Sequence, residues 1–128
     1  MEMKKMKLFL IIGAILGFLA VALGAFGAHG LEGRLSERAL TNWGKAVDYQ
    51  MFHTMAIVAV AILLGKFEGS NLFASSGWLF LAGIVLFSGS LYIYSLTGVK
   101  TLAMITPFGG LSFLVGWVLL GIGAMKLL

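Results

Sequence analysis

Four long stretches without a charged residue dominate the hydrophobic pattern of this chain. They cover residues 8–31, 49–65, 69–99 and 101–125. A helix needs about 20 mostly apolar residues to cross ~30 Å of hydrocarbon, whereas a membrane β-strand would show alternation instead of a continuous run. The pattern therefore predicts an all-α fold, an integral membrane four-helix bundle that forms a single transmembrane domain over residues 1–128. The helices are expected at about 8–28, 48–65, 75–96 and 106–127.

The first stretch follows three lysines, Lys4, Lys5 and Lys7, as a secretory signal would. Its apolar run is about 21 residues long, against ~7–15 for the core of a signal peptide, and further spans follow. We therefore interpret it as a retained first span.

Residues 31–47 are the one segment with mixed charges, and Leu31, Leu35, Ala39 and Trp43 recur in it every four residues. Ser36 is a suitable N-cap for a helix that begins near residue 37. This pattern predicts a short amphipathic segment between the first and second helices, lying on the membrane surface with Trp43 at headgroup level. A helix that continues unbroken into the second span is the alternative.

Pro107 is the only proline of the chain and decides where the last helix is expected to begin. Proline suits the first turn of a helix and disfavours helix in the residue before it. Thr106 is therefore expected to cap a helix whose first residue is Pro107, and residues 101–105 to form an interfacial turn. A kinked helix that begins at Thr101 is the competing interpretation.

Small residues recur along one face of the first helix and again along the last. In lipid, such a face lets another backbone approach closely, so that dispersion contacts accumulate. The expected helix-packing residues are Gly13, Gly17, Gly24, Gly27, Gly109 and Gly116. Packing inside one bundle is the simpler interpretation, and a homo-oligomer interface or a larger membrane complex is the alternative.

Composition agrees with a membrane location and excludes several kinds of site. The chain is 60% hydrophobic and 11% charged, while soluble domains carry about 25% charged residues. A net charge of +4 is explained by lysines that set topology and meet anionic lipid, so the lipid bilayer is the expected partner and nucleic acid is not. With no cysteine and only two histidines, neither a metal site nor a cofactor is expected.

Four spans place both termini on one side of the membrane. Five basic residues (Lys4, Lys5, Lys7, Lys66 and Lys126) fall on that side and four (Arg34, Arg38, Lys45 and Lys100) on the other. Because three of the five directly flank the first span, we expect a bacterial cytoplasmic membrane protein with cytoplasmic termini.

The same topology brings polar residues of all four spans into one leaflet. We call this set the polar patch: His29, Asp48, Tyr49, Gln50, His53, Ser88, Ser90, Tyr92, Thr106 and Pro107. Tyr49, Gln50 and His53 share a helix face, with His53 ~7 Å inside a boundary set by Asp48. Polar groups at that depth should face the bundle, because lipid offers no hydrogen-bond partner.

These motifs resemble those of the domain of unknown function 423 family, small four-helix bacterial membrane proteins with eukaryotic relatives named transmembrane protein 256. The resemblance covers nearly the whole chain after Lys7. The matching motifs are Gly24–Gly30, Tyr49–Gln50 with His53, Gly89–Tyr92, Ile105–Gly110 and Gly116–Trp117. The resemblance implies an integral membrane location and this topology, and it supplies no reaction or ligand.

Three classes of function remain at this stage. A structural, assembly or interaction protein fits the glycine faces and the lack of a catalytic motif. A small oligomeric transporter or channel is the alternative, although Asp48 at the boundary leaves no carboxylate inside a span to carry a proton. An enzyme that uses His53 as a general base is less favoured, since no nucleophile motif accompanies it.

Each polar feature also has a simple structural interpretation. His53 is expected to hydrogen-bond Ser88, Ser90 or Tyr92 of the third helix, and His29 to lie at a helix end or interface. If the last helix starts at Thr106–Pro107, its free N–H groups would favour an anion or a lipid headgroup.

Overall fold

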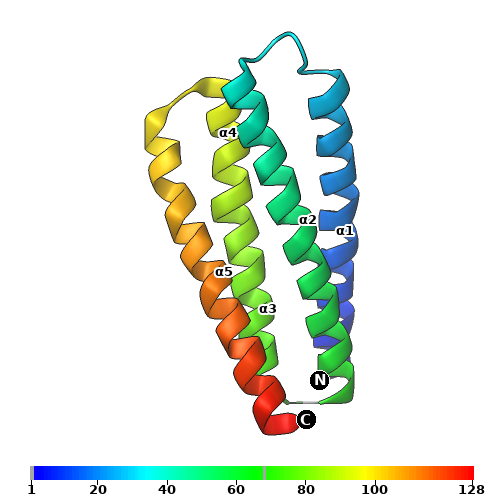
Figure 1. The fold of residues 1–128 in the computed structure, drawn as a ribbon. Helices are drawn as coiled ribbons and strands as arrows, with labels where there is room; N and C mark the ends of the chain where they lie inside the picture. Colours follow the sequence, from blue (N-terminus) through cyan, green and yellow to red (C-terminus); the bar gives the residue numbers. More distant parts are fainter. Residues whose placement is uncertain (1, 68) are drawn as a thin grey trace.

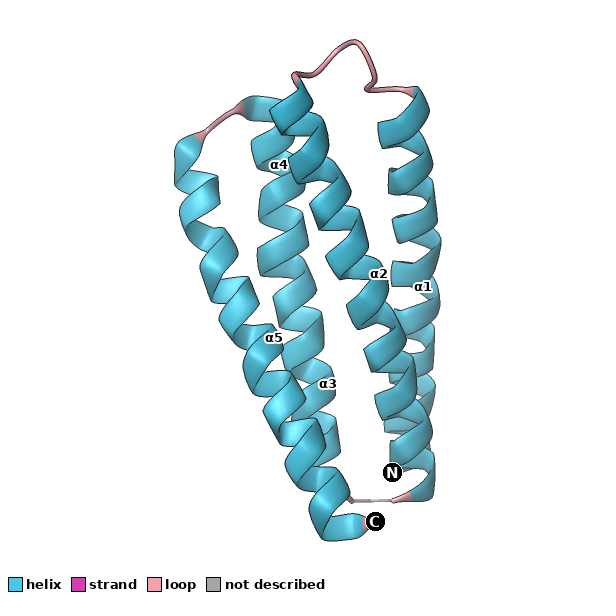
Figure 2. Cartoon of the chain, viewed as in Figure 1, coloured by secondary structure: helices cyan, strands magenta, loops and turns pink. Residues whose placement is uncertain are grey.

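The computed structural model describes residues 2–67 and 69–128 and contains four membrane-length helical segments in an up-and-down arrangement (Figure 1). The segments are α1 (Glu2–His29), α2 (Glu37–Lys66), a third segment made of α3 (Asn71–Gly83), the π-helical turn η1 (Ile84–Ser88) and α4 (Gly89–Thr97), and α5 (Lys100–Leu127). The described residues contain no strand (Figure 2). The predicted all-α four-helix bundle is therefore confirmed. Both termini lie at the same end, as expected for four spans.

The segment between the first two spans differs from the prediction. The hydroxyl of Ser36 does accept a hydrogen bond from the Ala39 N–H (3.1 Å), so Ser36 caps a helix that begins at residue 37. That helix continues unbroken to Lys66, as in the alternative interpretation, so the prediction of a separate surface helix is wrong. Trp43 is only 4% exposed and donates to the Leu23 carbonyl of α1 (2.9 Å). Its indole N–H therefore bonds inside the bundle and not to lipid headgroups.

The last helix corrects the prediction made from Pro107. α5 begins at Lys100 with Val99 as N-cap, and Pro107 lies in its interior. Thr106 also lies inside this helix and is therefore not its cap. Its hydroxyl lies 2.5 Å from the Ser90 hydroxyl of α4. Membrane helices tolerate such prolines where neighbouring helices and hydroxyls compensate for the lost backbone bond. The free N–H groups of α5 thus lie about 10 Å along the helix from Pro107, so the expected anion site at that residue is wrong.

The helices pack in an open order rather than in a closed ring. α1 packs chiefly on α2, α5 packs on α3, η1 and α4, and α2 contacts that third segment. α2 and α5 make no extensive backbone contact among the described residues. α2 and α5 therefore contact each other mainly through side chains. The candidate site lies between these two helices.

The expected packing glycines lie against neighbouring helices of the same chain. The α1 glycines face α2: Gly13 lies near Val58, Gly17 near Thr54, Gly24 near Val47 and Gly27 near the Trp43 ring. On α5, Gly109 lies against the backbone of Phe87 and Gly116 against the Phe80 ring. The glycine faces are used inside this bundle.

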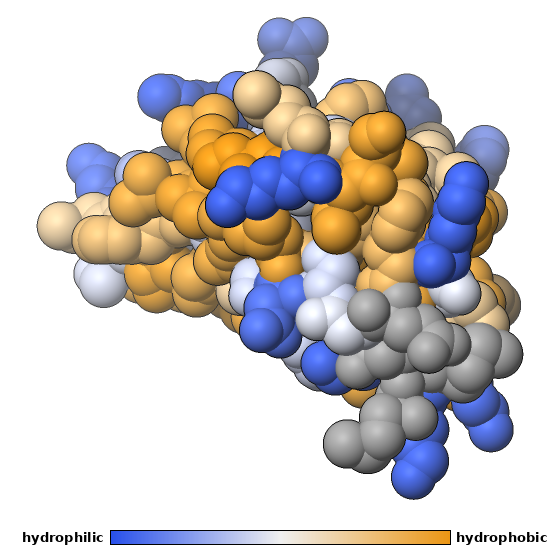
Figure 3. All heavy atoms as spheres, turned by 90° about the horizontal axis from the view of Figure 1, so that it is seen from below, coloured by the Kyte–Doolittle hydropathy of each residue, from blue (hydrophilic) through white to orange (hydrophobic). Residues whose placement is uncertain are grey.

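An apolar core closes the half of the bundle that is nearer the termini. Its fully buried members include Phe9, Ile57, Leu64, Phe73 and Phe80. Viewed from the terminal end, hydrophilic side chains surround a largely hydrophobic surface, and one of them lies across it (Figure 3). Among the described residues, this half is filled by apolar packing.

Candidate functional site

The structure divides the polar patch into separate groups instead of one cluster. Gln50 and Tyr92 form the first group, on the side of α2 that faces α1 and α4. The Gln50 amide donates to the Leu16 carbonyl of α1 (2.9 Å), and the Tyr92 hydroxyl donates to the Gln50 side-chain oxygen (2.7 Å). One side chain thereby joins three segments of the bundle. The Tyr92 ring also packs edge-on against Trp43, with ring centroids 4.8 Å apart.

Serine and threonine hydroxyls form a second group of contacts between helices. Ser88 donates to the Ala46 carbonyl of α2 (2.7 Å), and Ser90 pairs with Thr106 across the α4–α5 contact. These bonds hold the third segment to both of its neighbours. They leave none of these hydroxyls directed at His53.

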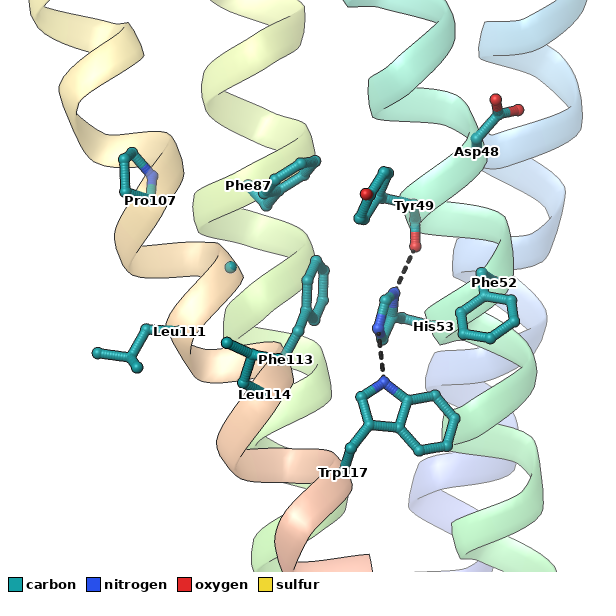
Figure 4. A pocket seen from close by; sticks show the side chains of 11 residues that line it. Asp48, Tyr49, Phe52, His53, Phe87, Pro107, Leu111, Phe113, Leu114 and Trp117 are labelled. Atoms are coloured by element: carbon teal, nitrogen blue, oxygen red, sulfur yellow. Dashed lines mark hydrogen bonds between the residues drawn. The ribbon is translucent and has the colours of Figure 1, made fainter.

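His53 has a different set of partners from the one expected. It is 4% exposed, and its imidazole lies between the Tyr49 carbonyl, 2.9 Å from Nδ1, and the Trp117 indole, which donates to Nε2 at 3.0 Å (Figure 4). Its ring stacks on Phe113 of α5 at 3.6 Å between centroids. Of the third segment only the Phe80 ring is recorded near it, at 5.6 Å. The predicted bond to Ser88, Ser90 or Tyr92 is therefore wrong, whereas the prediction that His53 faces the bundle is correct.

The two hydrogen bonds decide which nitrogen of His53 carries the proton. An indole N–H can only donate and a carbonyl can only accept. Nε2 must therefore offer its lone pair to Trp117, while Nδ1 carries the hydrogen that is donated to Tyr49. While both bonds are present the imidazole is neutral, since a protonated ring would leave no acceptor for Trp117.

An open groove lies beside this histidine, between α2 and α5. We call it the α2–α5 groove. Its volume is about 850 Å³, and it is lined by Asp48, Tyr49, Phe52, His53, Phe87, Pro107, Gly110, Leu111, Phe113, Leu114 and Trp117. Figure 4 shows the His53–Trp117 pair at its floor and the Phe113 ring beside it. The size falls within the ~300–1,000 Å³ typical of small-ligand pockets.

Two backbone irregularities shape the wall opposite α2. The π-helical turn η1 carries Phe87 into the groove, and Pro107 lines it from the interior of α5. π-helical turns occur frequently at functional sites. Tyr49 stacks on Phe87 across the groove, with ring centroids 4.4 Å apart.

Asp48 lines the groove and lies in the interior of α2, not at the helix start that the sequence suggested. It is exposed, about 16 Å from the start of α2. Exposed apolar side chains surround this level, among them Phe52, Leu111 and Leu114. No hydrogen bond or ion pair of its carboxylate is recorded among the described residues. Asp48 thus lies within α2, at the level of exposed apolar side chains.

His29 belongs to none of these groups. It is exposed at the last position of α1, and no contact of its ring with the rest of the polar patch is recorded in the described part of the chain. Its placement at a helix end matches the simple interpretation. Residues 2–67 and 69–128 also contain no cluster of three or more histidine, aspartate or glutamate side chains that could hold a metal ion.

The aromatic half of the groove could not be predicted from the sequence. Trp117, Phe113, Phe87 and Phe52 look like ordinary membrane residues. The missing signal was depth: His53 lies about 24 Å into α2 and Trp117 about 26 Å into α5, when each helix is measured from its observed start. With helix starts predicted at residues 48 and 106, His53 and Trp117 were expected at different depths, so their contact was not foreseen.

The comparison with known proteins agrees with this architecture. A family model described as a protein of unknown function (DUF423) matches residues 23–110. The chain belongs to the DUF423 family. It is 49% identical to the UPF0382 membrane protein YwdK of Bacillus subtilis, over 96% of this chain and all of the relative. It is 47% identical to a UPF0382 membrane protein of Staphylococcus haemolyticus, over 94% of this chain and 98% of the relative.

No solved structure matches this member of the DUF423 family. The names of its relatives describe membrane proteins and no activity. The chain is therefore an integral membrane protein of unknown molecular activity, and any function must be argued from its groove and interior.

Proposed function

We propose that this DUF423 protein is an interaction protein of the cytoplasmic membrane that binds its partner in the α2–α5 groove. The supporting observation is a contrast between its interior and its surface. Every buried polar side chain among the described residues has a hydrogen-bond partner within the chain: Gln50, His53, Thr54, Ser76, Ser88, Ser90 and Ser95. The groove, in contrast, is open and mostly apolar, and it is lined by Asp48, whose carboxylate has no hydrogen bond or ion pair with the described residues.

A small oligomeric transporter is the second candidate, and the position of Asp48 favours it. Ionisable groups inside a membrane commonly mark the path of an ion or substrate. A single chain offers no continuation of that path, because the interior nearer the termini is closed by the apolar core. Transport would therefore need polar surface from a second copy.

Cross-linking and flux measurements separate these two functions. A photo-reactive amino acid replaces Leu114 in the groove (65% exposed) or, as a matched control, Ile15 on the outer face of α1 (55% exposed). We expect an adduct of defined mass at residue 114 and none at residue 15. The purified protein in liposomes should pass neither protons nor alkali cations. Equal adducts at both positions, or ion flux above that of empty liposomes, would contradict the proposal.

A further inference from the structure

Given the proposed binding role of the α2–α5 groove, we propose that its occupant is a single-chain amphiphile with a cationic ammonium head. Asp48 supplies the opposite charge, neighbouring aromatic rings contact the head, and the apolar floor of the groove takes the hydrocarbon chain.

The charge of the occupant is argued from Asp48. Asp48 is exposed in the interior of α2 among apolar side chains, and a carboxylate in such surroundings is costly unless a cation accompanies it. Lys45 is the nearest basic residue on α2, one turn toward the helix start, and no ion pair between the two is recorded in the described residues. A lysine there can extend its ammonium toward the headgroups. The position opposite Asp48 is thus open to an external cation.

The aromatic rings indicate an ammonium head rather than a metal ion. Phe52 lies one helical turn after Asp48 on the same face, and its ring is 62% exposed (Figure 4). The ring of Tyr49 also lines the rim. Aromatic faces attract organic cations, and quaternary ammonium ions are bound this way in aromatic cages. A hard metal cation would need several oxygen ligands, and Asp48 is the one carboxylate that lines the groove.

The remainder of the groove fits a single apolar chain. Below the rim its wall is formed by Leu111, Leu114 and Phe113, and its floor by the neutral His53–Trp117 pair. Because His53 and Trp117 satisfy each other, the floor needs no polar group from a ligand. Asp48 and Phe52 also border a second hollow of about 550 Å³ on the outer side of α2, so the head would sit between the two hollows.

The test uses the full chain in nanodiscs of phosphatidylglycerol, a lipid without an ammonium group. The probes are dodecyltrimethylammonium, dodecanol and dodecyl sulfate, which share one chain and differ in the charge of the head. Binding is followed by tryptophan fluorescence, and Trp117→Phe should remove the response if the probe lies in the groove. We expect the cation to bind about tenfold more tightly than dodecanol, and dodecyl sulfate to bind most weakly.

Two variants separate this inference from the proposed function. Asp48→Asn should weaken binding of the cation about tenfold and leave dodecanol unchanged. Gly110→Leu should fill the groove and weaken both probes, because a Cβ at Gly110 meets only the Phe87 ring at 3.9 Å and so can be accommodated. Equal binding of cation and dodecanol, unaffected by Asp48→Asn, would overturn the inference and leave groove binding intact. If no probe binds the wild type better than Gly110→Leu, both proposals fail.

Discussion

At the scale of single residues, five of the seven buried polar side chains among the described residues have a hydrogen-bond partner on a neighbouring helix. His53 and Gln50 lie one turn apart on α2 but serve different neighbours. Gln50 joins α1 and α4, whereas His53 joins α5 through Trp117. The sequence correctly indicated that both face the bundle, because lipid offers no partner. It could not indicate which neighbour each would meet, since that depends on the rotation of four helices.

The proton position on His53 is a direct prediction. In protein labelled with ¹⁵N-histidine, His53 should show the neutral tautomer with hydrogen on Nδ1, and Trp117→Phe should shift its Nε2 resonance because the donor is lost. The same substitution should lower the free energy of unfolding by more than the ~0.6 kcal/mol average coupling of a hydrogen bond between membrane helices, because the smaller ring also loses packing against Phe52 and Phe80. Exposed His29 is the internal control and should not respond. Hydrogen on Nε2 in the wild type would contradict the hydrogen-bond assignment.

The Gln50–Tyr92 bond predicts a measurable coupling. Gln50→Leu and Tyr92→Phe each remove it, so the double variant should lose less stability than the sum of the single losses, by about 0.6–1.7 kcal/mol. Unfolding in mixed micelles, followed by circular dichroism, measures this difference. Ser112→Ala is the matched control, since Ser112 bonds the Leu79 carbonyl in a separate contact and should combine additively with Tyr92→Phe. Additive losses for Gln50 and Tyr92 would show that the bond is not formed in solution.

At the scale of helices, irregular features decide how closely neighbours approach. Phe87 enters the groove from the π-helical turn η1, and its backbone lies directly against Gly109 of α5. Pro107 lies two residues before Gly109 on the same helix and lines the groove. The contact between η1 and α5 therefore fixes one wall of the α2–α5 groove.

Two adjacent glycines on α5 test this contact. A Cβ at Gly109 would clash with the backbone of Phe87, while one at Gly110 would make an ordinary contact of 3.9 Å. Gly109→Ala should therefore lower the free energy of unfolding by about 1–3 kcal/mol. Gly110→Ala should be neutral or stabilising by up to ~1 kcal/mol, because alanine favours helix. Chemical unfolding of both variants in the same micelle gives the comparison, and equal effects would argue against the close contact at Gly109.

Helix positions were more predictable than helix ends. Uncharged runs located all four spans, since no other structure hides so many apolar residues in a bilayer. The predicted starts of α2 and α5 were wrong because local rules for Asp48 and Pro107 ignore the packing and hydrogen bonds that neighbouring helices supply. Those two errors put His53 and Trp117 at different depths and hid the groove. The separation of the polar patch into independent networks also needed coordinates, because sequence spacing gives the face of a helix but not its partner.

At the scale of the whole molecule, the open order of the helices distinguishes this chain from a closed four-helix bundle. α1 and α5 are on opposite sides of the central pair formed by α2 and the third segment. The half near the termini is closed by aromatic and aliphatic packing, and the groove runs between α2 and α5 from Asp48 and Pro107 in the other half to Trp117 just past mid-helix. A ligand in this groove would therefore enter from the lipid rather than through the bundle interior.

The orientation of the chain determines which side of the membrane the groove half faces. Because the chain contains no cysteine, single cysteines can replace Lys4, Lys66 and Lys126 at the terminal end or Glu32 and Lys100 at the other. The excess of lysine beside the first span favours cytoplasmic termini. An impermeant maleimide should therefore label positions 32 and 100 in intact cells, and positions 4, 66 and 126 only after permeabilisation. The reverse pattern would place the groove half toward the cytoplasm, and labelling of both sets in intact cells would mean that the chain inserts in two orientations.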